Sequence, residues 1–185
     1  MTAVLKREPI PREFLLDQAR QLFAERGFHA VSLRELGQAV GLHAGSLYAH
    51  IESKDALLLE LIEEGFENLI DGMQVRLAEA PTLQTFLRQH LAFRQANPHW
   101  YLLALTEARH LSAPAQQELQ ALKGDYASLL QRLLMRLAPG ATQLLAAKVA
   151  RQILYLLNTP PGSDSDALSD CLGDLEQLIL RRLQL

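Results

Sequence analysis

The stretch SLRELGQAVGLHAGSLYAHIESK, residues 32–54, decides the fold. Ser32 precedes a segment with helical spacing, and Glu35 follows three residues later, so the pair can form a capping box that satisfies two free N–H groups. Gly41 supplies the positive φ of a tight turn, and a short third segment follows over about residues 43–50. The apolar face of the helix after Ser32 consists of Leu33, Leu36 and Val40. Two short helices across a glycine turn predict a helix-turn-helix.

The second helix of such a pair enters the major groove of DNA. Its groove-facing residues are predicted to be His43, Ala44, Gly45 and Ser46. Small side chains there allow the backbone to approach the bases and leave room for a thymine methyl group. The motif therefore predicts binding to double-stranded DNA. A helix-turn-helix can also dock proteins, which leaves a helical interaction module as an alternative.

The first 60 or so residues resemble the DNA-binding head of the TetR family of one-component repressors. The likeness rests on residues at fixed spacing in three elements: Ala19, Leu22, Phe23, Gly27, Phe28, Ser32, Val40, Gly41, Leu42, the run from Gly45 to His50, Ser53, Lys54, Ala56 and Leu57. Three positions depart from the usual family pattern. Ile51 replaces Phe, Gly37 replaces Ala, and Ala44 replaces a longer polar residue.

This resemblance implies roles for individual side chains. Tyr48, His50 and Lys54 are expected to contact phosphates, which set affinity and register. Arg34 is expected to contact a phosphate or a base, and His43 and Ser46 to reach base edges. For Tyr48 the alternative is a packed core aromatic.

The rest of the chain has helical periodicity and no alternating strand pattern. Proline, glycine and capping residues divide it into helices. With the two short ones, they make about nine: residues 11–27, 53–77, 82–97, 98–111, 114–137, 142–157 and 166–183. The strongest loop signal is residues 158–165. We expect an all-α protein with a DNA-binding head at residues 1–54 and a ligand-binding and dimerisation body at residues 55–185.

Composition excludes several classes of protein. A single cysteine, Cys171, excludes a disulfide framework, and no histidine pair has metal-motif spacing. The chain has no Gly-rich phosphate loop, no G-x-S-x-G turn and no HExxH, so we expect neither an enzyme nor a metal or other cofactor. No apolar run reaches the roughly 18 residues of a membrane helix. We expect a cytoplasmic protein.

Net charge alone gives no indication of nucleic acid. The chain carries −3, but residues 1–54 hold seven Lys or Arg and six Asp or Glu, against eleven and fifteen in residues 55–185. The head is therefore close to neutral. Its affinity for DNA must come from a few well-placed groups, doubled by dimerisation, rather than from a broad positive field.

The last two helices predict a homodimer interface. They are apolar around much of their circumference, which a monomer surface would not expose. A two-fold axis through them would present two recognition helices to a palindromic operator. The residues expected at this interface are Leu145, Val149, Ile153, Leu156, Leu168, Leu172, Leu175 and Ile179. The alternative is that both helices belong to an internal core.

The middle helices predict a pocket for a small-molecule effector. The expected lining is Phe86, His90, Phe93, Trp100, Tyr101, Glu107, Tyr126 and Asn158. Aliphatic residues outnumber aromatic ones, which favours a lipophilic ligand such as a fatty-acyl group over a stacked planar drug. A ligand would act by shifting the distance between the recognition helices of the dimer. A DNA-binding regulator without a small-molecule ligand is the remaining alternative.

Overall fold

The computed structural model describes residues 10–158 and 172–184. Across these residues the chain forms nine α-helices, one π-helical turn and one 3-10 turn, with no strand. The all-helical prediction is confirmed. Cys171 and nearly all of the loop expected at residues 158–165 lie outside the described part of the chain.

The head consists of α1 (Arg12–Arg26), α2 (Leu33–Ala39) and α3 (Ala44–Leu47). The capping box is present, since the Ser32 side chain accepts from the Glu35 N–H while the Glu35 carboxylate accepts from the Ser32 N–H. Helix α3 is shorter than predicted because the chain turns after Leu47, where the His50 N–H bonds to the Leu47 carbonyl at 2.8 Å.

The turn between α2 and α3 explains one departure from the family pattern. Gly41 has φ +73°, the left-handed conformation that the motif requires. At Gly37 an added Cβ would lie 2.9 Å from the Leu42 carbonyl oxygen. The Leu42 N–H also bonds to the Gly37 carbonyl at 2.7 Å. Glycine at position 37 therefore permits a close approach that alanine would obstruct.

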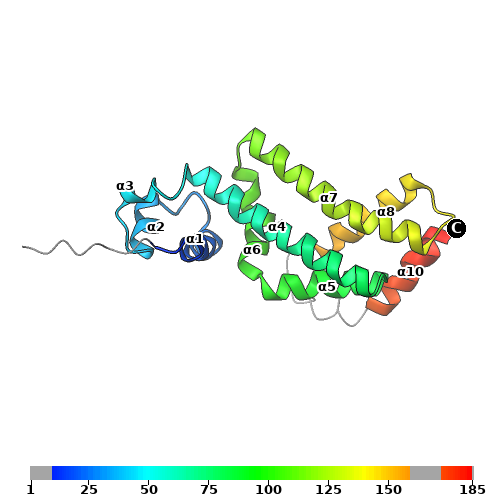
Figure 1. Cartoon of the computed structure of the whole chain (residues 1–185). Helices are drawn as coiled ribbons and strands as arrows, with labels where there is room; N and C mark the ends of the chain where they lie inside the picture. The colour runs from blue at the N-terminus through cyan, green and yellow to red at the C-terminus, as the bar shows by residue number, and fades with distance from the viewer. Residues whose placement is uncertain (1–9, 159–171, 185) are drawn as a thin grey trace, which may run out of the picture.

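The body is built on one long helix, α4 (Lys54–Glu79), which starts beside the head and continues between the other helices. Helices α5 (Leu83–Ala96) and α7 (Ala113–Leu137) pack on it, and α8 (Gln143–Leu157) and α10 (Leu172–Gln184) pack on these helices and on each other. Helix α7 packs against both α4 and α8. Figure 1 shows α3 at one end of the molecule and α8 and α10 toward the other.

The segment expected as one helix at residues 98–111 differs from the prediction. Helix α6 (Pro98–Leu102) is followed by a π-helical turn, η1 (Leu103–Glu107), and a 3-10 turn, η2 (Ala108–His110). Hydrophobic spacing does not distinguish these helix types over so few residues. π-Helical turns occur frequently at functional sites, and this one lies between the head and the body interior.

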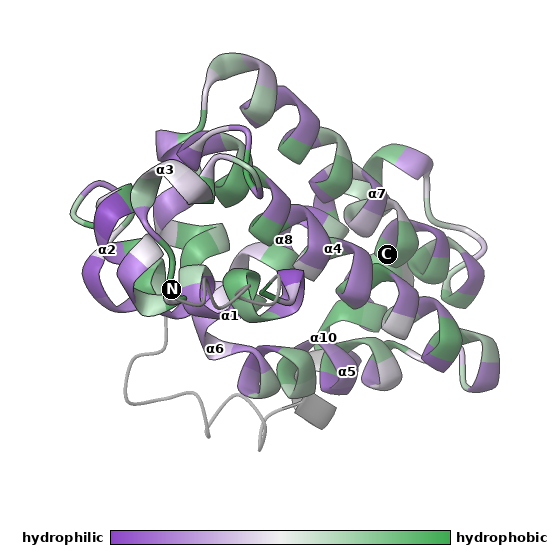
Figure 2. Cartoon of the chain, turned by 60° about the vertical axis from the view of Figure 1, so that its left-hand side comes forward, coloured by the Kyte–Doolittle hydropathy of each residue, from purple (hydrophilic) through white to green (hydrophobic). Residues whose placement is uncertain are grey.

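One continuous apolar core runs through head and body. Hydrophilic and hydrophobic residues alternate along the helices in Figure 2, as amphipathic helices around a shared core require. Within residues 10–158 and 172–184, none of the helices combines the length and apolar character needed to cross a membrane.

Candidate functional site

The predicted DNA-contacting residues lie around α2 and α3. Arg34 and three of the groove residues, His43, Gly45 and Ser46, are exposed, while Ala44 and His50 are half-buried. Tyr48 is 59% exposed, so its ring is not a core aromatic. These side chains are thus available on the surface, and their contacts with DNA remain predictions.

Lys54 is placed differently from the others. Its Nζ donates to the Phe28 carbonyl and lies 4.3 Å from the centroid of the Phe28 ring. Burial lowers the pKa of Lys54, and the neighbouring Asp55 opposes this shift. An ammonium has three N–H donors, so the bond to Phe28 leaves donors for the phosphate contact that the resemblance implies. In this structure, however, the contact that Lys54 makes is structural.

Phe28 connects the head to the body. Its carbonyl accepts from Lys54 at the start of α4, and its N–H donates to the Glu107 carboxylate at 2.8 Å. Glu107 ends the π-helical turn. Next to it, the ring of His110 stacks on Phe28 and its Nδ1 lies 2.9 Å from His29 Nε2. The backbone of Phe28 is therefore bound on one side by the first residue of α4 and on the other by Glu107 of the body.

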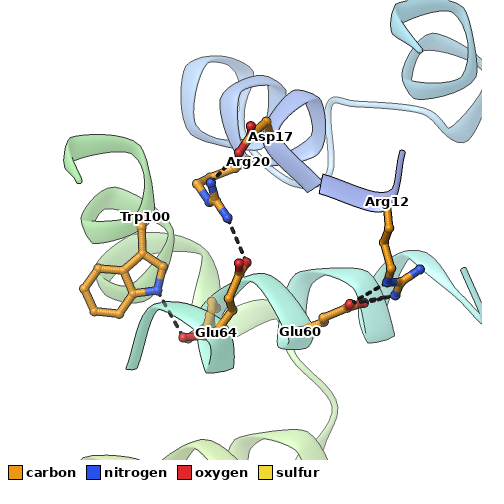
Figure 3. Close-up of polar contacts among 7 residues, drawn as sticks. Arg12, Asp17, Arg20, Glu60, Glu64 and Trp100 are labelled. Carbon is orange, nitrogen blue, oxygen red and sulfur yellow. Dashed lines mark hydrogen bonds and ion pairs between the residues drawn. The ribbon is translucent and has the colours of Figure 1, made fainter. Parts of the chain in front are cut away.

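Polar side chains of α1 also reach α4 (Figure 3). Arg12 bonds to Glu60 with distances of 2.5–3.0 Å and donates to the His50 carbonyl. Arg20 bridges Asp17 on its own helix and Glu64 on α4. These bonds tie α1 to α4 along one side of the head.

Tight packing of α4 against α6 completes this contact region. The indole N–H of Trp100 donates to the Ile62 carbonyl at 3.0 Å (Figure 3). Gly65 lies under the same ring, since an added Cβ would be 1.8 Å from Trp100 Nε1. We call the contact region of Phe28, Lys54, Gly65, Trp100 and Glu107 the joint.

A cavity of about 510 Å³ lies in the body. Its walls come from α4, α5, α6, η1, α7 and α8. Five of the predicted ligand-contacting residues line it: His90, Trp100, Tyr101, Tyr126 and Asn158. The structure thus brings most of the predicted pocket residues together around one space of ligand size.

Three predicted lining residues lie elsewhere. Glu107 points to the joint, where it binds the Phe28 N–H. Phe86 is fully buried behind the cavity wall, with its ring 5.4 Å from that of Tyr126. Phe93 packs edge-on against Trp100. Helical spacing predicted that these residues face inward or toward the cavity region, but it does not separate the first layer of side chains from the second.

His90 is the buried polar residue of the cavity wall, with 3% exposure. Its Nδ1 lies 2.8 Å from the Tyr126 hydroxyl, whereas its Nε2 makes no hydrogen bond in the described structure. Burial lowers the pKa of His90 to about 4, with a further contribution from the Arg94 guanidinium. The Leu157 carbonyl opposes this shift without reaching hydrogen-bond geometry to Nε2. The imidazole is therefore neutral at physiological pH.

The other polar groups of this wall are paired. The Tyr101 hydroxyl lies 2.8 Å from the Leu157 carbonyl and 2.7 Å from Asn158 Oδ1. Burial raises the pKa of Tyr101 to about 12, so it stays protonated. Arg94 also donates to the Leu157 carbonyl and lies over the Tyr101 ring. This network fixes the end of α8 against α5 and α6.

Two cationic residues also line the cavity, Lys123 on α7 and Arg151 on α8. Burial lowers the pKa of Lys123, and no ion pair to it occurs among the described residues. Arg151 continues into an adjoining surface depression that Lys148 also lines. Among the residues that the structure describes, the lining contains no Asp or Glu. The opening is therefore electrostatically suited to an anionic group.

The predicted interface residues divide into buried and exposed ones. Val149, Ile153 and Ile179 are buried within this single chain, so they belong to its own core. Leu145 is half-buried, and Leu156 is 46% exposed beside Leu178 at 63%. Leu172 and Leu175 lie at the start of α10, and Leu168 falls outside the described residues. The exposed apolar side chains border a groove between α8 and α10.

Sequence reasoning missed the joint. The fixed spacing of Phe28 and Lys54 in the family pattern is a signal for this contact, but the resemblance implies only a phosphate contact for Lys54. The pairing of Phe28 with Glu107 joins residues 79 positions apart, which no local pattern reveals. No cluster of His, Cys, Asp or Glu suited to a metal ion occurs in the part of the chain that the structure describes.

Known proteins resemble the chain most strongly in its head. Residues 15–61 match the family model described as bacterial regulatory proteins, tetR family. The transcriptional repressor KstR2 of Rhodococcus jostii is 41% identical over 58 residues, which are 31% of this chain and 28% of that protein. The chain thus aligns with less than a third of that relative. The fatty acid metabolism regulator of Bacillus subtilis is 20% identical over 147 residues, covering 76% of each chain.

Solved structures extend the similarity over the body. The TetR-family regulator PfmR of Thermus thermophilus has a TM-score of 0.74 at 25% identity, covering 90% of this chain and 97% of that one. AibR, in complex with isovaleryl coenzyme A and operator DNA, has 0.73 at 19%, covering 89% and 97%. FadR of Bacillus subtilis, in complex with stearoyl-CoA, has 0.70 at 17%, covering 94% and 97%. At these identities the last two show a shared fold.

Proposed function

The chain belongs to the tetR family of bacterial regulatory proteins, a family of transcription regulators and not of enzymes, and from this premise we propose that it is a ligand-responsive repressor in the cytoplasm. Residues 1–54 bind a palindromic operator, and residues 55–185 dimerise and bind the effector. The observation that carries the proposal is the exposed α2–α3 pair joined through Phe28 to a body that contains a cavity.

Operator binding rests on the surface around α3. Tyr48, His43 and Ser46 are exposed there without a role in the core. The remote position of α3 from α8 and α10 in Figure 1 leaves this end of the molecule open to DNA. A homodimer through the apolar groove between α8 and α10 would cover Leu156 and Leu178 and would present two copies of α3.

The effector is proposed to be an amphipathic anion with an apolar chain. Aliphatic and aromatic side chains form most of the cavity wall, while Lys123 and Arg151 provide positive charge without an acidic residue among the described lining. Acyl-coenzyme A compounds have this combination of an apolar chain and phosphate groups. AibR and FadR, which share the fold, are described with isovaleryl coenzyme A and stearoyl-CoA respectively.

The π-helical turn is the proposed route from cavity to head. Ala104 and Leu105 of this turn line the cavity, and Glu107 at its end accepts the Phe28 N–H. A ligand that displaces the turn therefore changes the position of Phe28 and, through it, the head. It relieves repression only if it binds the non-DNA state more tightly.

Binding of the chain to the DNA upstream of its own coding sequence tests the proposal. We expect fluorescence anisotropy to show binding of a dimer per site, with release by a long-chain acyl-coenzyme A. Tyr48→Ala should weaken binding about ten-fold through loss of a phosphate contact, with an unchanged melting temperature. Gln117→Ala, on an exposed position of α7, is the matched control. Binding unaffected by Tyr48→Ala would favour the protein-interaction alternative.

The coupling route has its own test. Glu107→Gln weakens the bond to Phe28 while leaving the cavity lining intact. We expect this variant to keep its affinities for acyl-coenzyme A and for free operator within a few-fold, but to lose most of the ligand's effect on operator binding. An undiminished effect would show that the signal does not pass through Phe28. Operator binding that no acyl-coenzyme A changes would favour a regulator without this effector.

A further inference from the structure

We propose that His90 donates a hydrogen bond from Nε2 to an uncharged carbonyl oxygen of the cavity ligand, as found in an ester, thioester or amide. This inference rests on the proposed effector function and specifies what the cavity recognises beyond apolar volume. It assigns His90 and Tyr126 as a polar subsite inside a mainly apolar wall.

The direction of the hydrogen bond follows from counting donors and acceptors. His90 Nδ1 and the Tyr126 hydroxyl are 2.8 Å apart, and either atom can supply the hydrogen. If Nδ1 donated, the tyrosine hydrogen and Nε2 would both lack a partner. If Tyr126 donates, only Nε2 is left without one. Because buried polar groups are seldom unpaired, the second arrangement is favoured, and it places the hydrogen on Nε2.

The remaining donor has no acceptor in hydrogen-bond geometry among the described residues, since the Leu157 carbonyl that influences the pKa of His90 already accepts from Arg94 and Tyr101. His90 lines the cavity, and its Nε2 is the one buried side-chain nitrogen or oxygen in the described residues without a hydrogen bond. Tyr101 and Ser128, which also line the cavity, are already bonded to the carbonyls of Leu157 and Gly124. An acceptor on the ligand would therefore bond to His90 rather than to these groups.

The preferred acceptor is neutral because its donor is neutral. Burial and the nearby Arg94 keep the pKa of His90 at about 4, so the ring offers an N–H group without a positive charge. A carboxylate placed deep in this wall would lose its hydration without gaining an ion pair to the ring. A carbonyl oxygen needs one hydrogen bond and carries no charge, so it meets the donor at much lower desolvation cost.

The opening of the cavity supplies the complementary preference. Lys123 and Arg151 favour an anionic group there, while His90 favours a carbonyl at the wall. A compound with an apolar chain, an internal carbonyl and a separate anionic part satisfies both. A simple alkane fills the space but leaves the His90 N–H as unpaired as it is in the free chain, so it gains no affinity from this group.

The test compares two uncharged probes with the same number of non-hydrogen atoms, methyl laurate and n-pentadecane. Each displaces N-phenyl-1-naphthylamine from the full-length protein, measured by fluorescence. We expect His90→Phe to lower the affinity for methyl laurate about ten-fold and to change the affinity for n-pentadecane by less than two-fold. His90→Gln keeps an N–H donor and should retain most of the ester affinity.

A second measurement does not depend on the folding of a variant. In protein labelled with ¹⁵N, the His90 ring should be in the Nε2–H form, and its Nε2 resonance should shift with methyl laurate and not with n-pentadecane. Tyr126→Phe should reduce both this tautomer and the ester affinity. If His90→Phe lost the same affinity for both probes, or if the His90 ring were in the Nδ1–H form, the proposed polar subsite would be wrong. The cavity could still bind a ligand. Failure of every probe, N-phenyl-1-naphthylamine included, would instead overturn the proposed effector function.

Discussion

The joint and the cavity contain the same residue types in opposite situations. Lys54 at the joint has a carbonyl and an aromatic ring around its ammonium, whereas Lys123 at the cavity has no ion-pair partner among the described residues. Gly65 at the joint has no room for a methyl group, whereas Gly124 at the cavity has nothing within 4 Å of an added Cβ. The joint is thus filled and paired, whereas the cavity is open, and among the described residues His90 Nε2 lacks a hydrogen bond and Lys123 lacks an ion pair.

This difference separates structure from recognition. Buried donors that already have acceptors stabilise the fold, since breaking such a bond leaves an unpaired group. Donors without acceptors, such as His90 Nε2, are left for a ligand. Residue type alone does not tell the two apart, because both regions contain half-buried lysines, aromatic rings and helical glycines.

The largest expected effect comes from filling the joint. Gly65→Ala places a methyl group on Trp100 Nε1 and displaces the indole from its bond to the Ile62 carbonyl. We expect a loss of about 3–5 kcal/mol in the free energy of unfolding, similar to removing a buried tryptophan. Urea denaturation followed by circular dichroism measures it.

Gly124→Ala is the matched change at the cavity. The position is helical and open, so alanine should raise the free energy of unfolding by up to about 1 kcal/mol through helix propensity. Equal effects at both glycines would contradict the distinction between a filled joint and an open cavity.

The next largest effect is the loss of folding stability at low pH that is caused by the buried His90 in the cavity wall. The pKa of His90 is about 4 in the folded chain against 6.5 ordinarily. Between these values the unfolded chain binds a proton that the folded chain does not, so stability falls as the pH falls from 6.5 to about 4. The full difference is about 3 kcal/mol. Unfolding free energies of the wild type and His90→Gln across this range measure it.

Comparing the wild type with His90→Gln separates the effect of His90 on the pH dependence of stability from the effects of other titrating groups. His90→Gln should show a shallower decline, while His43→Gln, at an exposed position of the head, should follow the wild type. If His90→Gln declines as steeply as the wild type, His90 is not buried in the way that the structure describes.

The sequence predicts the head more completely than the body. Capping by Ser32 and Glu35 and the turn at Gly41 depend on neighbours in the chain, and both are found as predicted. Helical spacing also predicts that His90, Tyr101 and Tyr126 share one pocket, and all three line the cavity. Local physics suffices for such features because the partners lie within one or two helical turns or on adjacent apolar faces.

The joint depends on contacts between distant segments. The π-helical turn at residues 103–107 contacts α1, and the preceding α6 packs against both α1 and α4. Glu107 was therefore predicted as a ligand contact although it binds Phe28. The restriction at Gly65 depends on Trp100, 35 positions away. Hydrophobic periodicity indicates which residues are buried, but it does not indicate which distant residues they contact.

A smaller effect is expected at the two lysines. Lys54→Met removes a charge-assisted bond to the Phe28 carbonyl and should lower the free energy of unfolding by about 1–2 kcal/mol. Lys123→Met removes a half-buried ammonium that has no ion-pair partner among the described residues, so stability should be unchanged or higher. Thermal unfolding of both variants measures these changes in stability. A greater loss of stability in Lys123→Met than in Lys54→Met would contradict the distinction between joint and cavity.

Lys54→Met also tests the phosphate contact. If Lys54 binds a phosphate as well as Phe28, the slope of log affinity against log salt concentration should decrease in magnitude by about one per operator-bound Lys54. A lower melting temperature with an unchanged slope would assign this residue to the joint alone.

The smallest effect is expected at the rim of the joint. The side chains of Arg12 and Glu60 are 50% and 36% exposed, so solvent screens their attraction. Glu60→Gln should lower the free energy of unfolding by less than about 1 kcal/mol, and 1 M salt should remove most of the difference. Arg12 would still donate to the His50 carbonyl, which limits the loss. A loss above 2 kcal/mol that 1 M salt removes would mean that charge pairs rather than packing around Trp100 and Gly65 connect head and body, and the joint would then be open to disruption by ionic conditions in a way that a packed contact is not.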